Sequence, residues 1–217
     1  MGIAAGVYVV LICLSGSVLV YRNELYTYFS PVSGGPVPAG FRATTWLMDF
    51  HDNLLAGTTG RFVNGIGAWL VVGLCLSGAV IWWPGIRNWR RSLTIEPTRL
   101  TWTLHSALGF WFFAFILMWG VTGAFLSFQS AFGAVFDRLQ PFNDANPVDR
   151  LVDRIQYWLA YIHFGRLGGR GIPGCGRGWC DATTKLIWAI AGLVPPVMFV
   201  TGALMWWTRV VRPSRRG

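Results

Sequence analysis

The chain contains three histidines, His51, His105 and His163, and each adjoins an apolar run long enough to cross a membrane. A single histidine near a helix end is usually an ordinary interfacial residue. Three histidines at equivalent places of a repeated pattern need a further reason, because an unpartnered ionisable side chain in a membrane is costly. Neutral imidazoles from different helices suit the axial positions of haem iron, and such cofactors lie between the helices of a bundle. We expect His51 and His163 to clamp one haem, and His105 to belong to a second site.

Other metal chemistry fits the three histidines less well. They are expected to lie on two membrane faces, so they cannot form one zinc or copper site. The sequence has no C-x-x-C-H motif for covalent attachment, so the expected cofactor is haem b. Arg61 and Arg166 follow histidines and are candidates for pairing with haem propionates, with an ordinary helix-flanking charge as the alternative.

Cys175 and Cys180 are spaced C-x4-C in a glycine-rich loop. This spacing favours a small disulfide over a redox-active or metal-binding pair. Cys13 and Cys75 lie inside apolar runs and are expected to be packing residues.

The composition predicts an all-α integral membrane protein. Of the 217 residues 53% are hydrophobic and only 12% are charged. About 20 helical residues cross a hydrocarbon core of about 30 Å. By this measure the apolar runs predict four transmembrane helices, over residues 3–21, 63–83, 103–128 and 185–207. The four helices are expected to form a bundle, and residues 1–217 a single membrane domain.

Further features of the sequence predict how these spans begin and end. Residues 30–45 are rich in Pro and Gly and read as a loop, and His105 is expected in the first turn of the third span. Residues 148–161 form an amphipathic stretch that is expected to lie along the membrane surface. Pro84 and Gly85 are expected to end the second span, and Pro195-Pro196 to kink the fourth.

Each expected span carries a hydroxyl residue followed by glycine and a small residue near its C-terminal end, beginning at Ser15, Ser77, Thr122 and Thr201. We call the hydroxyl residue and the glycine that follows it a hydroxyl–glycine signature. Four occurrences at the same helix depth indicate duplication of a two-helix unit. His105 lies 17 residues before Thr122, and the same register in the first span puts a matching histidine just before Met1. One haem is therefore expected, and a second only if its missing ligand lies upstream.

The formal net charge of +9 would suggest nucleic acid binding in a soluble protein, but most arginines here flank apolar runs. The loop 84–101 and the C-terminal tail together hold eight arginines and one acid. This density predicts that both termini face the cytoplasm of a bacterial inner membrane, with His51 and His163 toward the exterior and His105 toward the cytoplasm. No nucleic acid partner is expected.

The pattern resembles the PepSY-associated transmembrane helix family. The matching segments are 51–61, 76–84, 105–111, 163–166 and 201–209, which read HDNLLAGTTGR, LSGAVIWWP, HSALGFW, HFGR and TGALMWWTR. The resemblance implies an inner-membrane b-type haem protein that carries electrons across the bilayer, similar to ferric-siderophore reductases, with His51, His163 and His105 at the haem-ligand positions. The chain departs from the family pattern in lacking a histidine at the start of the first helix, and in a short loop over about residues 22–61.

The leading hypothesis is therefore a transmembrane haem protein with reductase activity toward a ferric chelate or another external acceptor. The electron donor is external, because no G-x-G-x-x-G follows a strand. A second hypothesis is an accessory structural or haem-binding subunit of a larger redox or photosynthetic membrane complex. A third, a transporter or siderophore-uptake accessory, is disfavoured by the lack of acidic residues along the spans.

Overall fold

A computed structural model describes residues 2–83, 89–90, 94–142, 150–168, 172 and 175–212, and every regular element in these residues is helical. The α-helices are α1 (Gly2–Leu19), α2 (Arg22–Tyr28), α3 (Ala39–Asn53), α4 (Gly57–Trp82), α5 (Leu100–Ser127), α6 (Gln129–Leu139), α7 (Leu151–His163), α8 (Gly178–Gly192) and α9 (Val194–Trp206). A 3-10 turn, η2 (Pro97–Arg99), leads into α5, and a π-helical turn, η3 (Trp207–Val211), follows α9. The all-α expectation is confirmed for the described residues.

Three helical segments are long and apolar enough to cross a membrane: Gly57–Trp82, Pro97–Ser127 and Gly178–Val211. A fourth is obtained if α1 and α2, which meet at a bend of 58°, are counted as one span. The chain is thus a multi-pass membrane protein.

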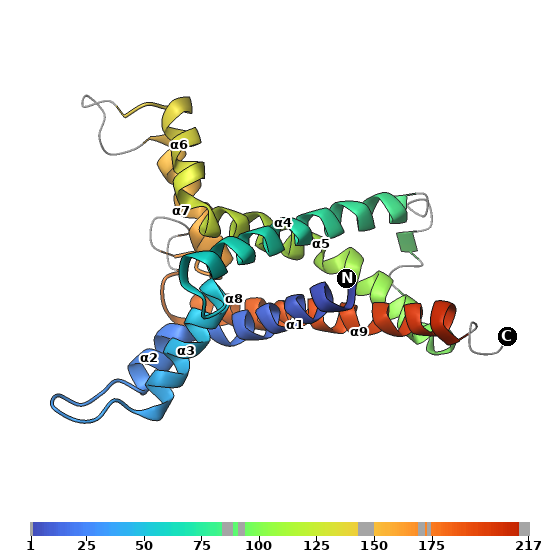
Figure 1. Cartoon of the computed structure of the whole chain (residues 1–217), viewed down its shortest axis with the longest axis horizontal. Coiled ribbons are helices and arrows are strands. Elements are labelled where there is room, and N and C mark those ends of the chain that lie inside the picture. The colour runs from blue at the N-terminus through green and yellow to red at the C-terminus, as the bar shows by residue number, and fades with distance from the viewer. Residues whose placement is uncertain are drawn as a thin grey trace.

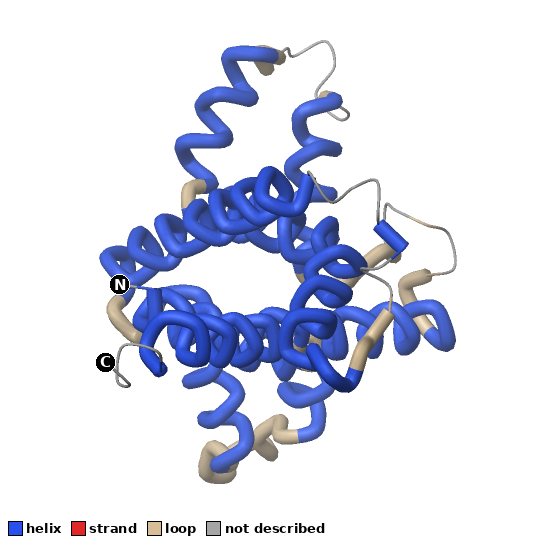
Figure 2. The backbone as a smooth tube through the Cα atoms, turned by 90° about the vertical axis from the view of Figure 1, so that its right-hand side faces the viewer, coloured by secondary structure: helices blue, strands red, loops and turns tan. Residues whose placement is uncertain are grey.

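The spans form two layers (Figure 1). Helix α5 packs against α4 and against α9, and α1 packs against both α8 and α9. Two helical hairpins, α2–α3 and α6–α7, project from one end of the bundle, and both chain termini lie toward the other end. Figure 2 shows the bundle from one end, with the two hairpins extending in opposite directions from it. The hairpins carry two of the three histidines to the same end of the molecule.

The expected boundaries of the first loop and the second span were partly wrong. Residues 39–45 belong to α3, because the Pro- and Gly-rich composition ends at Gly40 and Pro38 immediately precedes the first turn of the helix. Helix α4 begins at Gly57 rather than near residue 63, since its first turns are polar and hydropathy does not register them. The expected break at Pro84 and Gly85 lies outside the described residues.

The fourth span is two helices, α8 and α9, interrupted at Leu193. Proline has no backbone N–H to donate, so Pro195 and Pro196 are tolerated only in the first turn of a new helix. The expected kink is therefore present as a break. Helix α8 begins at Gly178, before the expected start at residue 185, because the buried Lys185 inside it is ion-paired with Asp181 and Glu24.

The segment between the third and fourth spans holds two helices. Helix α7 corresponds to the expected amphipathic stretch, of which residues 148–149 lie outside the described residues. Helix α6, over Gln129–Leu139, was not expected. Arg150 joins the two helices by binding Asp137 of α6 and Asp153 of α7, each at 2.7 Å.

Candidate functional site

The rings of His51 and His163 face each other at the hairpin end of the bundle. Their centroids are 6.4 Å apart and their planes are inclined at 56°. His51 lies in the last turn of α3 and His163 ends α7, so both sit at the C-terminal ends of peripheral helices. The expectation that they stand at the entrances of spans was wrong in this respect, because the polar residues around them form helices of their own.

Helix α3 is held against α4 by contacts at its last turn. The Nδ2 of Asn64, on α4, donates to the backbone carbonyls of His51 at 2.7 Å and Asp52 at 3.1 Å. The hydroxyl of Tyr8, on α1, bonds in turn to the Asn64 side chain. A Cβ at Gly60 would come within 1.7 Å of the Asn53 carbonyl oxygen, so only glycine allows α3 to end this close to α4. These contacts fix the backbone position of His51.

Helix α7 ends against two tryptophans. Trp119 Nε1, on α5, donates to the His163 carbonyl at 3.3 Å, and Trp188 Nε1, on α8, donates to the Ile162 carbonyl at 2.8 Å. The chain then turns at Gly165, whose φ is +66° and whose missing Cβ would lie 2.7 Å from Trp188. The carbonyls that a helix leaves unpaired at its C-terminus are satisfied here by side chains of the spans.

Both imidazoles use Nδ1 for contacts within the protein. The His51 Nδ1 lies 2.9 Å from Ser15 Oγ on α1, and the His163 Nδ1 lies 2.8 Å from Thr122 Oγ1 on α5. Burial lowers the pKa of His163 to about 3, and the neighbouring His51 and Arg22 act in the same direction. Burial likewise lowers the pKa of His51. Both rings are therefore neutral at physiological pH, which is the form that binds metals.

A cavity between α1, α4, α5 and α8 adjoins the two rings and has a volume of about 250 Å³. On the same measure one water needs about 10–15 Å³, so the space suits a much larger group. Its walls include small residues and apolar side chains, among them Gly16, Ala68, Val71, Gly120 and Gly123. Among the described residues no three His, Cys, Asp or Glu side chains gather to hold a metal ion. A metal between these two imidazoles would therefore take its other ligands from the group that fills the cavity.

The arginines at this end are arranged differently from the expectation. Arg61 is ion-paired with Asp52. Arg166 is half-buried, and its backbone N–H donates to the Tyr161 carbonyl at 2.9 Å. Arg22 lines the cavity, with its guanidinium 4.2 Å from the centre of the Phe164 ring.

Sequence reasoning did not select Arg22. The available signal was its place as the first charged residue after the first apolar run, on the same side of the membrane as His51.

His105 lies apart from the other two histidines, in the second turn of α5. Its Nδ1 lies 3.0 Å from the Met198 carbonyl and 3.0 Å from Thr201 Oγ1, both on α9. Thr122, which contacts His163, is further along α5 by about 25 Å, at 1.5 Å per residue. The structure therefore brings His51 and His163 together and keeps His105 at the opposite end of the bundle.

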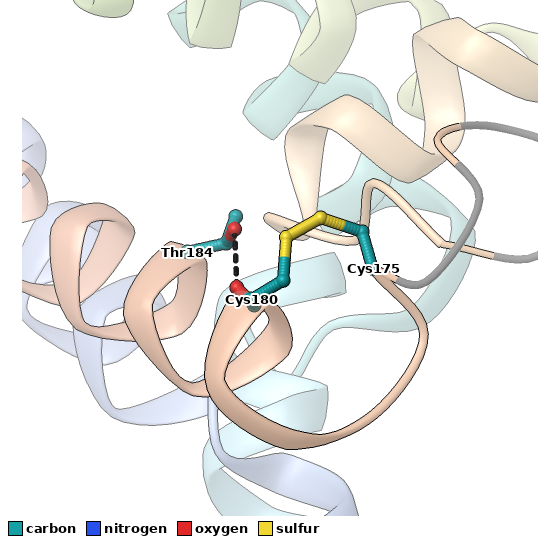
Figure 3. Close-up of a disulfide and its surroundings, with 3 residues drawn as sticks. All are labelled: Cys175, Cys180 and Thr184. Carbon is teal, nitrogen blue, oxygen red and sulfur yellow. Dashed lines mark hydrogen bonds between the residues drawn. A yellow bond between two sulfur atoms is a disulfide. The ribbon is translucent and has the colours of Figure 1, made fainter.

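Cys175 and Cys180 form a disulfide with a Cα–Cα distance of 4.9 Å (Figure 3). Cys180 lies in the first turn of α8, where its carbonyl accepts a hydrogen bond from Thr184 at 2.8 Å. Through Trp188, α8 also contacts the end of α7, so this disulfide belongs to the helix that supports His163. Cys13 and Cys75 are free and half-buried.

The helical fold, the spans and the site together define a multi-pass membrane protein with a histidine pair inside its bundle. Comparison with known proteins agrees with this class. The chain belongs to the family described as the PepSY-associated TM region, whose model matches residues 26–149 and 140–209.

One relative is a Pseudomonas aeruginosa (strain PAO1) protein that bears the name "Uncharacterized protein PA4219". It is 32% identical over 92 residues, which are 41% of this chain and 23% of that protein. The chain thus matches under a quarter of the length of this relative. No solved structure matches the chain.

Proposed function

We propose that this protein is a b-type haem protein that transfers electrons across the bacterial inner membrane, with His51 and His163 as the two axial ligands of one haem. The observation that carries the proposal is the 6.4 Å separation of the two imidazole centroids across a cavity. Two bonds of about 2.0 Å from nitrogen to metal, plus about 1.1 Å from each nitrogen to its ring centre, add up to about 6.2 Å. The spacing of the rings fits one metal ion between them.

The donor set supports haem over a bare metal ion. The two neutral imidazoles would supply two ligands, and the porphyrin of a haem would supply the remaining nitrogen ligands. The Nδ1 atoms of His51 and His163 already contact hydroxyls, which leaves Nε2 of each ring for iron. The lack of a C-x-x-C-H motif favours non-covalent haem b.

The other residues of the site bind and shield the cofactor. The walls of the cavity are mostly apolar and limit the access of water to the rings. Arg22, at the cavity and next to His163, is the cation we assign to a propionate, in place of Arg61, which is paired with Asp52. Arg166 is close enough to Arg22 to add to the positive charge there. When bound, haem supplies a reversible one-electron change of iron, and the protein sets its potential.

A second haem site would lie at the other end of the bundle and would use His105. Its ring is held by α9, in the same way that α1 and α5 hold the other two rings. This correspondence supports the proposed duplication of a two-helix unit. We assign one haem to the pair of His51 and His163, and a second would need a further ligand beside His105.

The electron donor and acceptor lie outside this chain. We assign the cytoplasmic side to both termini and to His105, and the exterior to the pair of His51 and His163. The acceptor is then a ferric chelate or another external oxidant, as for the ferric-siderophore reductases that the sequence resembles.

The test is a reduced-minus-oxidised optical spectrum with pyridine haemochrome quantitation on the detergent-purified protein. We expect about one haem b per chain, loss of that haem in both His51→Ala and His163→Ala, and retention in His105→Ala, the matched control. Loss of haem in only one member of the pair would refute the paired ligation. If the folded protein takes up no haem from a supplied excess, the proposal fails.

An alternative is an accessory subunit of a larger redox or photosynthetic membrane complex. The exposed aromatic side chains favour it: Trp179, beside the disulfide, is 90% exposed, and Trp46 on α3, stacked on Phe50, is 55% exposed. Exposed tryptophans are frequent anchors of protein interfaces. Stable co-purification with larger partners, together with no reduction of ferric chelates by the isolated chain, would favour this alternative.

A further inference from the structure

Three of the four hydroxyl–glycine signatures contact a histidine that comes from a different helix. In each case the hydroxyl oxygen lies within hydrogen-bond distance of the imidazole Nδ1. The pairs are Ser15 with His51 at 2.9 Å, Thr122 with His163 at 2.8 Å and Thr201 with His105 at 3.0 Å. The signatures therefore do more than let helices pack closely.

The hydrogen bonds that these hydroxyls make within their own helices indicate which group donates to which. A serine or threonine hydroxyl has one proton, and in each signature it is donated to a carbonyl of its own helix. Ser15 donates to the Ile12 carbonyl at 2.9 Å, and Thr122 donates to the Met118 carbonyl at 2.7 Å. A carbonyl only accepts, so the hydroxyl oxygen is left to accept from the imidazole. Nδ1 consequently carries the proton, and Nε2 carries the lone pair.

A separate contact indicates the same tautomer for His105, with the proton on Nδ1. Its Nδ1 lies 3.0 Å from the Met198 carbonyl, which has no proton to give. The Nδ1 of His105 must therefore be a donor whatever Thr201 does, and Nε2 is again the free nitrogen.

In these three signatures the glycine lies against one edge of the same histidine ring. A Cβ on the glycine would meet the Cε1 atom of the histidine as its nearest or second-nearest neighbour. The distances are 3.0 Å at Gly16 to His51, 3.4 Å at Gly202 to His105 and 3.7 Å at Gly123 to His163. Hydroxyl and glycine thus act together, one holding Nδ1 and the other accommodating the adjacent carbon.

The fourth signature supplies an internal comparison. Ser77 is exposed and donates to the Leu74 carbonyl at 3.0 Å, like its counterparts. A Cβ at Gly78, however, would meet nothing within 4 Å among the described residues. All three histidines of the chain lie at the other signatures, so Ser77 has the same chemistry without a ring to hold.

We infer that Ser15 and Thr122, each with the glycine that follows, are positioning residues that fix the Nδ1–H tautomer and the orientation of His51 and His163, so that Nε2 points to the iron. The part that concerns iron rests on the proposed haem function, whereas the tautomer applies to the haem-free protein as well. A hydrogen bond from the distal nitrogen of a metal-bound imidazole raises the basicity of the ligand. The two hydroxyls would therefore lower the reduction potential of the haem.

The first test needs no haem. Nitrogen-15 NMR of the ring nitrogens in the haem-free, full-length protein distinguishes the tautomers, and variants that each lack one of the three histidines assign the signals. We expect Nδ1 protonated in all three rings, and a loss of that preference at His51 in Ser15→Ala and at His163 in Thr122→Ala. Nε2-protonated rings in the wild type, or unchanged shifts in both variants, would overturn the inference.

The second test uses the haem-loaded protein. Ser15→Ala and Thr122→Ala should each weaken haem affinity by about 10- to 100-fold and shift the reduction potential upward. Ser15→Thr and Thr122→Ser should restore both values, because they return a hydroxyl. Ser77→Ala, the matched control, should leave affinity and potential at the wild-type values.

The outcomes separate the two proposals. A wild-type protein that binds no haem refutes the proposed function and leaves the tautomer test standing. A protein that binds haem with the same affinity and potential in Ser15→Ala, Thr122→Ala and Ser77→Ala keeps the proposed function and overturns the positioning role. Equal shifts in all three variants would also overturn it, because Ser77 holds no ring.

Discussion

At the scale of single residues, the charge at the cavity gives a prediction that separates Arg22 from the arginines selected by sequence. Arg22→Gln should lower haem affinity by about 10-fold or more, since a hydrogen bond to a charged group contributes about 1.5–3 kcal/mol. Arg61→Gln should change it less, because Arg61 is already paired with Asp52. Haem titration of each variant measures the difference. A larger loss in Arg61→Gln would return the propionate role to Arg61.

The residues that the sequence did identify were those whose type is unusual in a membrane. Three histidines beside apolar runs stand out because hydrocarbon disfavours them, so their selection needed no structure. The sequence could not reveal that Asp52 pairs with Arg61, since the partner lies on a neighbouring helix. The same applies to Ser15 and Thr122. Their repetition was visible, whereas their contact with histidines depends on how α3 and α7 fold back.

At the scale of elements, the turn after α7 is expected to control the stability of the site. Gly165→Ala places a side chain at φ +66° and within 2.7 Å of Trp188, and the left-handed conformation alone costs about 1–2 kcal/mol. Gly133→Ala is the matched control, because a Cβ in α6 would meet nothing within 4 Å and alanine favours a helix by up to about 1 kcal/mol. The unfolding temperature in detergent should fall for the first variant and rise slightly for the second. A fall of equal size in both would contradict the assigned role of the turn.

The elements were predicted where hydropathy decides them. The apolar cores of the second, third and fourth spans agree with the described helices, because about 20 apolar residues leave the chain no other structure in a bilayer. The polar first turns of α4, Gly57–Phe62, and the start of α8 were not predicted as helix. Helix formation in these segments depends on tertiary contacts, such as the ion pair of Lys185 with Glu24. Helix α3 was missed for the same reason. Its residues are helical because they pack on α1, α2 and α4.

At the scale of the whole molecule, two independent features predict the orientation in the membrane. The loop 84–101 and the C-terminal tail hold eight arginines against one acid, and the disulfide of Cys175 and Cys180 lies at the start of α8, the helix that contacts the end of α7 beside His163. Disulfides persist in oxidising compartments, which agrees with an exterior histidine pair. In intact cells a membrane-impermeant maleimide should label Tyr28→Cys, on the exposed tip of α2, but label Trp83→Cys only after lysis. The wild type, with Cys13 and Cys75, gives the background, and the reverse pattern would refute the orientation.

Helices α3 and α7 have a consequence for how the protein is made. They have 15 and 13 residues, too few to be inserted as spans, yet they carry both histidines of the pair. Membrane helices are inserted first and associate afterwards, so these two short helices dock only when α1, α4, α5 and α8 already stand beside one another. The histidine pair is therefore complete only after the spans have associated. Binding of the proposed haem would then follow the association of the spans, and a chain whose spans had not associated would not hold it.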